Sequence, residues 1–172
     1  MDQIINNPYY TRAKTLHEFT VKDIKGDLVK LDKYNGNVCI YVNVATNSPF
    51  TDTHYKQFND LMDKFADTKG LRILAFPCNQ FGMEEPGTPE SISAHAEAHN
   101  VKFDIFAKID VNGETACDVW KFMKAQVPGG AHGRMIKNNY TKFIVTKQGV
   151  PMERYGPEVQ PIELEKVLCC YW

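Results

Sequence analysis

One stretch of the sequence constrains the fold more than any other: a strand-like run that passes through a short polar turn into a helical pattern. Residues 38–44 are almost all apolar or β-branched, as in a strand covered on both faces. Residues 52–65 then repeat their apolar side chains at helical spacing. Ser48 lies in the turn between them, where a helix N-terminus offers free backbone N–H groups and a partial positive charge.

A second strand is expected over residues 71–76, directly after Gly70, which is suited to end the helix. The order strand, helix, strand predicts a right-handed crossover and a parallel pair of strands. Sites in open α/β sheets form at the carboxyl ends of parallel strands. We therefore expect Ser48 and the loop over residues 78–80 to be neighbours, although they are far apart in the sequence.

The rest of the chain continues to mix strands and helices. Apolar and polar residues alternate around turn residues in two segments, which predicts β-hairpins over residues 16–31 and 142–155. A further strand is expected over 103–109, and helices over 91–100, 115–126 and 161–168. Thr88 followed by Pro89 is a helix start signal. Residues 1–14 form a polar lead-in, and no repeat or linker divides the chain, so one domain over residues 1–172 is expected.

Charge and composition limit the classes of partner. Lys and Arg number 20 and Asp and Glu 21, so the net charge of -1 gives no global electrostatic case for nucleic acid. No apolar segment is long enough to span a bilayer, and the first residues lack the pattern of a signal peptide, which predicts a soluble cytoplasmic protein. Neither the five cysteines nor the five histidines show metal spacing, so no metal and no cofactor is expected. His95 and His99 are expected on a solvated helix face.

Three motifs identify a family. Residues 74–82 read Leu-Ala-Phe-Pro-Cys-Asn-Gln-Phe-Gly, with Glu-Pro-Gly at 85–87. Asn-Val-Ala at 43–45, with Thr51 and Tyr55, and the run Ile-Lys-Asn-Asn-Tyr-Thr-Lys-Phe at 136–143 complete the set. Together they resemble the glutathione peroxidases, and weaker matches extend the resemblance from His17 to Lys166. The short connection between Gln126 and Ile136 is similar to that of the monomeric phospholipid-hydroperoxide branch.

The resemblance implies a fold and an activity. The fold is α/β and thioredoxin-like, with a central mixed β-sheet flanked by helices and an N-terminal β-hairpin. The activity is the reduction of hydroperoxides, including lipid hydroperoxides, with glutathione as reductant. The resemblance also implies a monomer that meets an anionic membrane surface transiently. Three cations near the expected site are candidates for that contact, namely Arg134, Lys137 and Lys142.

The resemblance places four catalytic positions on this sequence. Gln80 and Asn139 match the family. Asn138 stands where the family has Trp, and Ser48 stands where it has selenocysteine or cysteine. Pro49 replaces the glycine that follows the family's nucleophile.

The serine is the decisive departure, because oxygen cannot run the two-electron oxidation steps that sulfur runs. Ser48 is instead expected to be either a structural cap of the helix, with Pro49 at its first position, or a passive residue of the pocket. The sequence therefore predicts a degenerate site with little or no hydroperoxide reduction and a binding or scaffold role. The alternative is an active peroxidase, either one whose selenocysteine was replaced by serine for expression or one that uses Cys78 as a substitute thiol. The partner cysteine of thiol-type members would fall near Ala96, where this chain has none.

Overall fold

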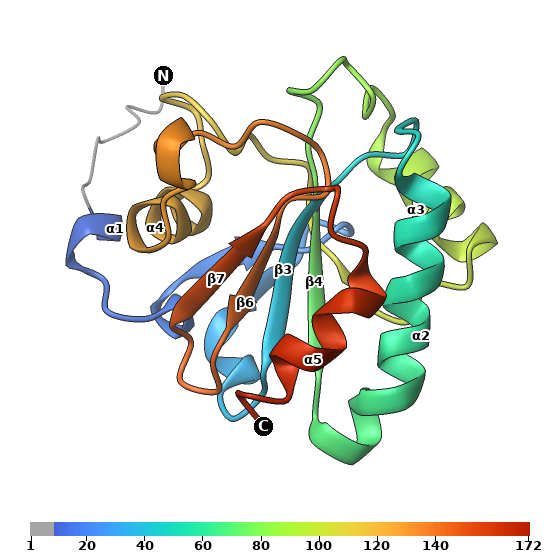
Figure 1. The fold of residues 1–172 in the computed structure, drawn as a ribbon. Coiled ribbons are helices and arrows are strands. Elements are labelled where there is room, and N and C mark those ends of the chain that lie inside the picture. The colour runs from blue at the N-terminus through green and yellow to red at the C-terminus, as the bar shows by residue number, and fades with distance from the viewer. Residues whose placement is uncertain (1–8) are drawn as a thin grey trace.

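The computed structural model describes residues 9–172, and a mixed five-stranded sheet forms its centre (Figure 1). The strand order is β5-β4-β3-β6-β7. The first three of these strands run parallel to one another, whereas β6 pairs antiparallel with both β3 and β7. Their bounds are β3 Cys39–Val44, β4 Arg72–Pro77, β5 Asp104–Ile105, β6 Lys142–Val145 and β7 Pro151–Tyr155.

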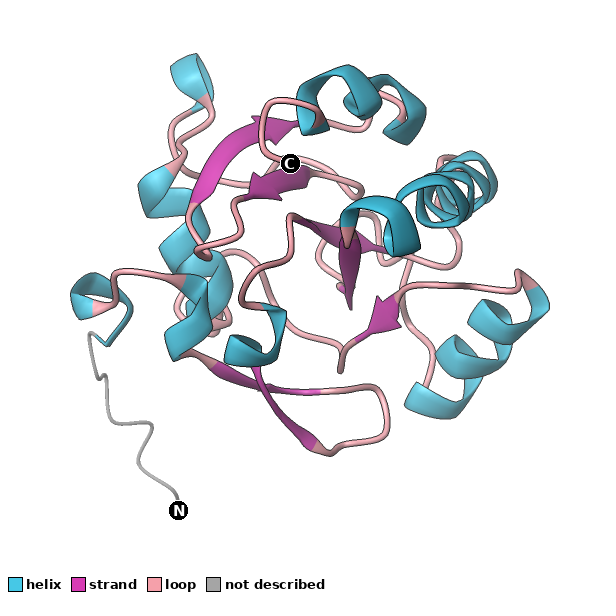
Figure 2. Ribbon diagram, turned by 90° about the horizontal axis from the view of Figure 1, so that it is seen from below, coloured by secondary structure: helices cyan, strands magenta, loops and turns pink. Residues whose placement is uncertain are grey.

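Helices cover both faces of this sheet, and a separate antiparallel hairpin lies at its periphery (Figure 2). The hairpin consists of β1 (Thr20–Lys22) and β2 (Leu28–Lys30). The helices are α1 Tyr9–Arg12, α2 Thr51–Lys69, α3 Pro89–Ala98, α4 Asp118–Gln126 and α5 Glu165–Leu168. Short 3₁₀ turns cover Leu16–Glu18, Leu31–Tyr34, Gly130–His132 and Pro161–Leu164.

Strand β3 divides the apolar core into two layers, because alternate side chains point to opposite faces. Cys39 and Tyr41 join the layer that α4 and the hairpin complete. Ile40 and Val42 join the layer that α2 and α5 complete. All six residues of the strand are buried, as its almost entirely apolar sequence predicts.

The elements around the central crossover confirm the expectations from the sequence. The strands β3 and β4 are parallel, in a register that runs from Cys39 opposite Arg72 to Val44 opposite Pro77. Gly70 ends α2 in the left-handed conformation with φ of 73°. Thr88 caps α3, since its hydroxyl accepts the N–H of Ser91 at 3.2 Å.

Three expectations were wrong in their extent. The strand expected over 103–109 is only two residues long. The N–H groups of Phe106 and Ile109 still donate to β4, but the Ala107 N–H donates to Lys22 and Phe106 bridges to Asp23, so the regular pairing with β4 ends at Ile105. The helix expected from residue 115 begins at Asp118, since Asp110 holds the preceding residues through the Thr115 hydroxyl (2.6 Å) and the Cys117 N–H (2.9 Å). The C-terminal helix over 161–168 is a 3₁₀ turn followed by one α-helical turn.

The expected polar lead-in is described only in part. Residues 1–8 lie outside the described range, and residues 9–12 form α1, which packs beside α4. Within residues 9–172, no helix combines the length and the apolar character needed to cross a bilayer.

The two-layer core gives a first prediction for stability. Ile144 of β6 is fully buried, whereas Ile162 keeps 41% of its surface exposed. We expect Ile144→Val to lower the free energy of unfolding by about 1 kcal/mol, because one buried methylene group is lost and a small cavity is left. Ile162→Val makes the same chemical change at the surface and is expected to have little effect. Urea denaturation of the two variants checks the difference, and equal losses would contradict this assignment of the core.

Candidate functional site

The turn between β3 and α2 holds Ser48 in a buried position, with 9% of its surface exposed. The N–H of Phe50 donates to Ser48 Oγ at 3.2 Å, and the N–H of Thr51 donates to Ser48 O at 3.1 Å. The expectation that Ser48 caps the helix with Pro49 at its first position was wrong. The helix begins at Thr51, its cap residue is Phe50, and no side chain caps it. Ser48 instead closes a tight turn just before the helix.

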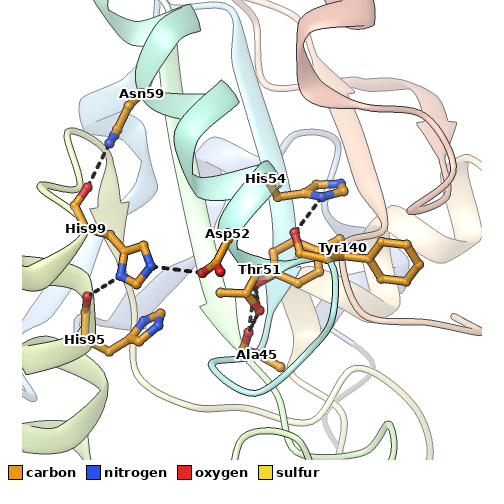
Figure 3. Close-up of polar contacts among 9 residues, drawn as sticks. Ala45, Thr51, Asp52, His54, Asn59, His95, His99 and Tyr140 are labelled. Atoms are coloured by element: carbon orange, nitrogen blue, oxygen red, sulfur yellow. Dashed lines mark hydrogen bonds and ion pairs between the residues drawn. The ribbon is translucent and has the colours of Figure 1, made fainter.

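The backbone of this turn is fixed from beneath by a small hydroxyl cluster (Figure 3). The Thr51 hydroxyl donates to the carbonyl oxygen of Ala45 at 2.5 Å. The Tyr140 hydroxyl lies 2.7 Å from the same oxygen and 2.9 Å from Thr51 Oγ1. Because all three residues are buried, the turn that carries Ser48 is held by contacts that exclude water.

The structure brings the four positions singled out in the sequence together around one cavity of about 430 Å³. The turn after β3, the loop after β4 and the loop before β6 each contribute one wall. Its lining is Ser48, Pro49, Phe50, Gln80, Phe81, Gly82, Glu84, Lys137, Asn138 and Asn139. Ser48 and the loop after β4 are therefore neighbours, although their individual roles stay predictions.

The Gln80 amide is engaged away from Ser48. Its Oε1 accepts the N–H groups of Val111 and Asn112 at 2.8 and 3.0 Å. Its Nε2 donates to the carbonyl oxygen of Asn112 at 3.0 Å. These three bonds tie Gln80 to the loop after β5 and fix the orientation of its amide in the wall of the cavity, while the second proton of Nε2 is not used by them.

Asn139 is paired with a carboxylate that the sequence analysis did not single out. Its Nδ2 donates to Glu84 Oε2 at 2.7 Å, which fixes the orientation of the amide because a carboxylate accepts but cannot donate. Asn139 Oδ1 is buried without a hydrogen-bond partner among the described residues. Glu84 lies between Gly82 and Glu85, two residues of the motif at 74–87. Its place within this motif is the signal that could have identified it from the sequence. The cavity that Ser48 lines thus also carries a carboxylate in its wall.

The turn that carries Asn138 and Asn139 is attached to β3 by a buried amide. Asn43 Nδ2 donates to the carbonyl oxygen of Asn138 at 3.1 Å, and Asn43 Oδ1 accepts the N–H of Thr141 at 3.0 Å. Tyr140 between them adopts φ of 62°, in the left-handed region that non-glycine residues rarely enter. The Asn138 side chain itself is exposed at the mouth of the cavity. The surrounding bonds hold a strained backbone where the site residues lie.

Cys78 lies close to the site but is a poor candidate for a substitute thiol. It is fully buried, and its Sγ is 3.6 Å from Gln80 Oε1. Burial raises the pKa of the Cys78 thiol, which lowers the fraction of reactive thiolate near neutral pH. Cys39, buried within β3, has its pKa raised to about 12 for the same reason.

Of the three candidate surface cations, two are exposed and one is not. Arg134 and Lys137 are exposed, and Lys137 lines both the Ser48 cavity and an adjoining cavity of about 800 Å³. Lys142 is fully buried, so the expectation that it meets a lipid surface was wrong. The larger cavity also contains Arg154, which the sequence analysis did not single out as a site residue.

Lys142 points instead at a buried histidine. Its Nζ lies 2.9 Å from His54 Nε2, while His54 Nδ1 is 3.0 Å from the carbonyl oxygen of Phe50. Since a carbonyl only accepts, Nδ1 carries the proton and Nε2 accepts from the lysine. Burial, together with the charge of Lys142, lowers the pKa of His54 to about 3. Burial lowers the pKa of Lys142 to about 7, against the opposing effect of Glu158 and Glu163.

The pair His95 and His99 is not a solvated face, so that expectation was wrong. Both rings are half-buried and pack edge-on against Tyr55, and His99 also contacts Asp52 at 3.1 Å (Figure 3). Neither ring lines the Ser48 cavity. Within residues 9–172, no cluster of three His, Cys, Asp or Glu side chains could hold a metal ion.

The sheet order and the site at the ends of β3 and β4 define the class of this chain as a thioredoxin-like protein. Solved structures of low sequence identity support that fold, for example a thiol:disulfide interchange protein of Chlorobium tepidum at 12% identity and a TM-score of 0.62, with 89% of this chain and 92% of that chain covered. T. cruzi GPX1 is more similar, with a TM-score of 0.77, 34% identity, and coverage of 92% of this chain and 96% of that chain.

The chain belongs to the glutathione peroxidase family. The family model described as glutathione peroxidase matches residues 16–124. The phospholipid hydroperoxide glutathione peroxidase of Bos taurus is 52% identical over 160 residues, which cover 92% of this chain and 81% of the relative. That of Mus musculus is 51% identical over 160 residues, with the same coverage. These findings confirm the family that the three motifs indicate.

The histidine beneath the site makes stability depend on pH. The unfolded chain binds a proton at residue 54 below pH 6.5, whereas folded His54 does so only near pH 3. The free energy of unfolding should therefore fall as the pH falls through this window, by up to about 1.4 kcal/mol per pH unit from this residue. We expect His54→Asn to flatten the pH dependence by that slope, as measured by urea denaturation between pH 4 and 7. Parallel profiles for the two proteins would contradict a neutral His54.

Proposed function

We propose that this chain is a glutathione peroxidase family protein with a binding or scaffold role, and that it reduces hydroperoxides little or not at all. The observation that carries the proposal is the oxygen of Ser48 at the position where the family resemblance places selenium or sulfur. The contacts of Ser48 support it, because Oγ accepts the Phe50 N–H as a neutral hydroxyl does.

The chemistry of the reaction explains why this atom decides. When a thiolate attacks a hydroperoxide, the O–O bond breaks, an alcohol leaves and the sulfur is oxidised by two electrons to a sulfenic acid, which thiols later reduce. The same attack by the oxygen of Ser48 would form a new O–O bond as the old one breaks. No net reduction of peroxide would follow. A serine hydroxyl is also a weak nucleophile without an adjacent base.

A second candidate function is an active hydroperoxide reductase whose gene specifies selenocysteine or cysteine at position 48. The observation that favours it is the retention of Gln80 and Asn139 in the wall of the cavity. Pro49 and Asn138 favour natural degeneration instead, because a replacement made for expression would leave those positions unchanged. The genomic codon for residue 48 separates the two candidates, since a selenocysteine-type stop codon would favour an active peroxidase.

An assay of turnover tests the main proposal. We expect the protein to oxidise no glutathione above background with either hydrogen peroxide or a phospholipid hydroperoxide. Ser48→Cys is expected to consume hydroperoxide slowly, because sulfur can be oxidised there while Glu84 disfavours its thiolate. NADPH consumption in a coupled glutathione reductase assay measures both rates.

Two further variants interpret that assay. Ser48→Ala should match the parent, which shows that any gain in Ser48→Cys comes from the sulfur. Rapid turnover by the parent would overturn the proposal. Its loss in Cys78→Ser would then assign the reaction to Cys78.

The face around the two cavities has the character of a lipid-contact surface, and we propose transient binding to anionic phospholipid there. Three apolar side chains are exposed beside the cavities, namely Phe50 (42%), Met83 (73%) and Met135 (54%). Lys137 lines both cavities and its Nζ lies 3.7 Å from Met135 Sδ, and the exposed Arg134 directly precedes Met135 in the sequence. Apolar side chains next to cations are the combination that binds an anionic membrane surface.

Vesicle sedimentation tests this surface. We expect binding to phosphatidylserine vesicles at low salt, weaker binding at high salt, and a several-fold loss in Lys137→Glu, because charge attraction is screened by salt. Lys147→Glu is the control, since Lys147 follows β6 at the opposite end of the sheet. Equal losses in the two variants would contradict a defined surface.

A further inference from the structure

The fully buried Lys142 ammonium beneath the site has all of its hydrogen-bond donors satisfied. Its Nζ donates to His54 Nε2 at 2.9 Å and to the carbonyl oxygens of Tyr140 and Gly156, both at 3.0 Å. An ammonium group has three protons, so each contact takes one. Burying a charge is unfavourable unless it is fully hydrogen-bonded, and here three acceptors compensate for lost water. The hydrogen bonds of this ammonium, rather than apolar packing, therefore account for its place in the core.

The three acceptors belong to three different segments of the chain. His54 lies in the first turn of α2, Tyr140 lies in the turn before β6, and Gly156 follows β7. One ammonium therefore cross-links the helix that follows Ser48, the turn that carries Asn139, and the loop that lines the larger cavity.

The contact with His54 continues to the Ser48 turn. His54 Nδ1 donates to the Phe50 carbonyl oxygen at 3.0 Å, which fixes the last residue before α2 (Figure 3). The N–H of that same Phe50 donates to Ser48 Oγ. A shift of the imidazole would thus move the peptide groups on which the Ser48 hydroxyl depends.

The contact with Tyr140 acts on the opposite wall of the cavity. Tyr140 holds a left-handed φ of 62° directly after Asn139, and its carbonyl oxygen accepts one of the lysine protons. Strained backbone persists only where neighbours over-determine it. Lys142 is one of these neighbours, together with the Asn43 side chain.

We propose that Lys142 is a positioning residue of the Ser48 cavity, which sets the Ser48 turn and the Asn139 turn relative to each other, with His54 as the link to Phe50. The proposal rests on this cavity being the functional site, as proposed above, but it does not depend on whether peroxide is turned over.

The protonation state of Lys142 can be changed near neutral pH, because burial lowers its pKa to about 7. The effect of that change can be followed at residues that line the cavity. The groups that face it are His54 on α2, Tyr140 in the turn, and the carboxylates of Glu158 and Glu163. Loss of one proton leaves the amine with two donors for three acceptors, so one link must weaken. The backbone amides of Phe50 and Asn139 should therefore respond to pH together.

Backbone amide NMR of the wild-type chain between pH 5.5 and 9 tests the proposal. We expect the Phe50 and Asn139 signals to shift with a common midpoint, and both shifts to vanish in Lys142→Met. Lys147→Met, at the other end of the sheet, should leave both intact. A role in packing alone would lower stability without coupling these two amides. Titrations that persist unchanged in Lys142→Met would overturn the proposal.

The variant His54→Asn tests the same proposal while keeping Lys142 in place. This second test is needed if Lys142→Met does not fold. We expect the Phe50 titration to disappear while that of Asn139 remains, because only the link through the imidazole is cut. If both titrations remain, His54 is not the link and the proposal fails.

The reactivity of a probe thiol at position 48 gives an independent measure. In the Ser48→Cys chain, added Lys142→Met is expected to lower the rate of thiol alkylation at pH 7 about threefold or more, because the Phe50 N–H that Lys142 orients through His54 favours the thiolate. Phe122→Leu, a change in the core layer on the other face of the sheet, should reduce stability without this loss. Equal alkylation rates with and without Lys142 would count against positioning. No arm requires peroxide reduction, so failure here and failure of the proposed function are distinguishable.

Discussion

The parallel pairing of β3 with β4 is the constraint on which the rest of the site depends. Val44 lies opposite Pro77, so the two strands end level with each other. The Cys78 N–H then donates to the Val44 carbonyl oxygen at 3.0 Å, which keeps the two chains together for one more residue. The loops that carry Ser48 and Gln80 consequently leave the sheet at one edge. The parallel pairing alone is enough to place these two loops next to each other.

The third wall of the cavity arrives by a different route. The turn before β6 joins β3 from its other side, where the pairing is antiparallel. A buried polar residue, Asn43, makes that attachment with both ends of its amide, while the Tyr140 N–H donates to its carbonyl oxygen at 2.7 Å. Buried polar groups that are fully bonded specify a single arrangement more strictly than apolar packing does. The polar residue within an otherwise apolar strand therefore serves the site rather than the core.

Local patterns were enough to predict the elements with strong periodicity and the edge of the sheet at which Ser48 and the loop after β4 meet. They failed where one particular hydrogen bond or backbone contact decided the outcome. The bridge between Phe106 and Asp23 ends the regular pairing of β5 after Ile105. The bond from Thr115 to Asp110 holds the residues before α4 out of the helix. The charge of Lys142 predicted an exposed side chain. Its burial is explained by three acceptors, of which Tyr140 is close in the sequence whereas Gly156 and His54 are not. The prediction that Ser48 caps α2 also failed, because the helix begins later, at Thr51, and Phe50 occupies the cap position.

The carboxylate of Glu84 limits what a single substitution at position 48 can achieve. A sulfur atom placed there would lie in a cavity with this negative charge, which disfavours the thiolate. Asn139 donates its amide to Glu84, so that donor is not free to offset the charge. Fast redox chemistry at position 48 would therefore need two changes together, sulfur at position 48 and a neutral side chain at position 84. Either change alone would gain little.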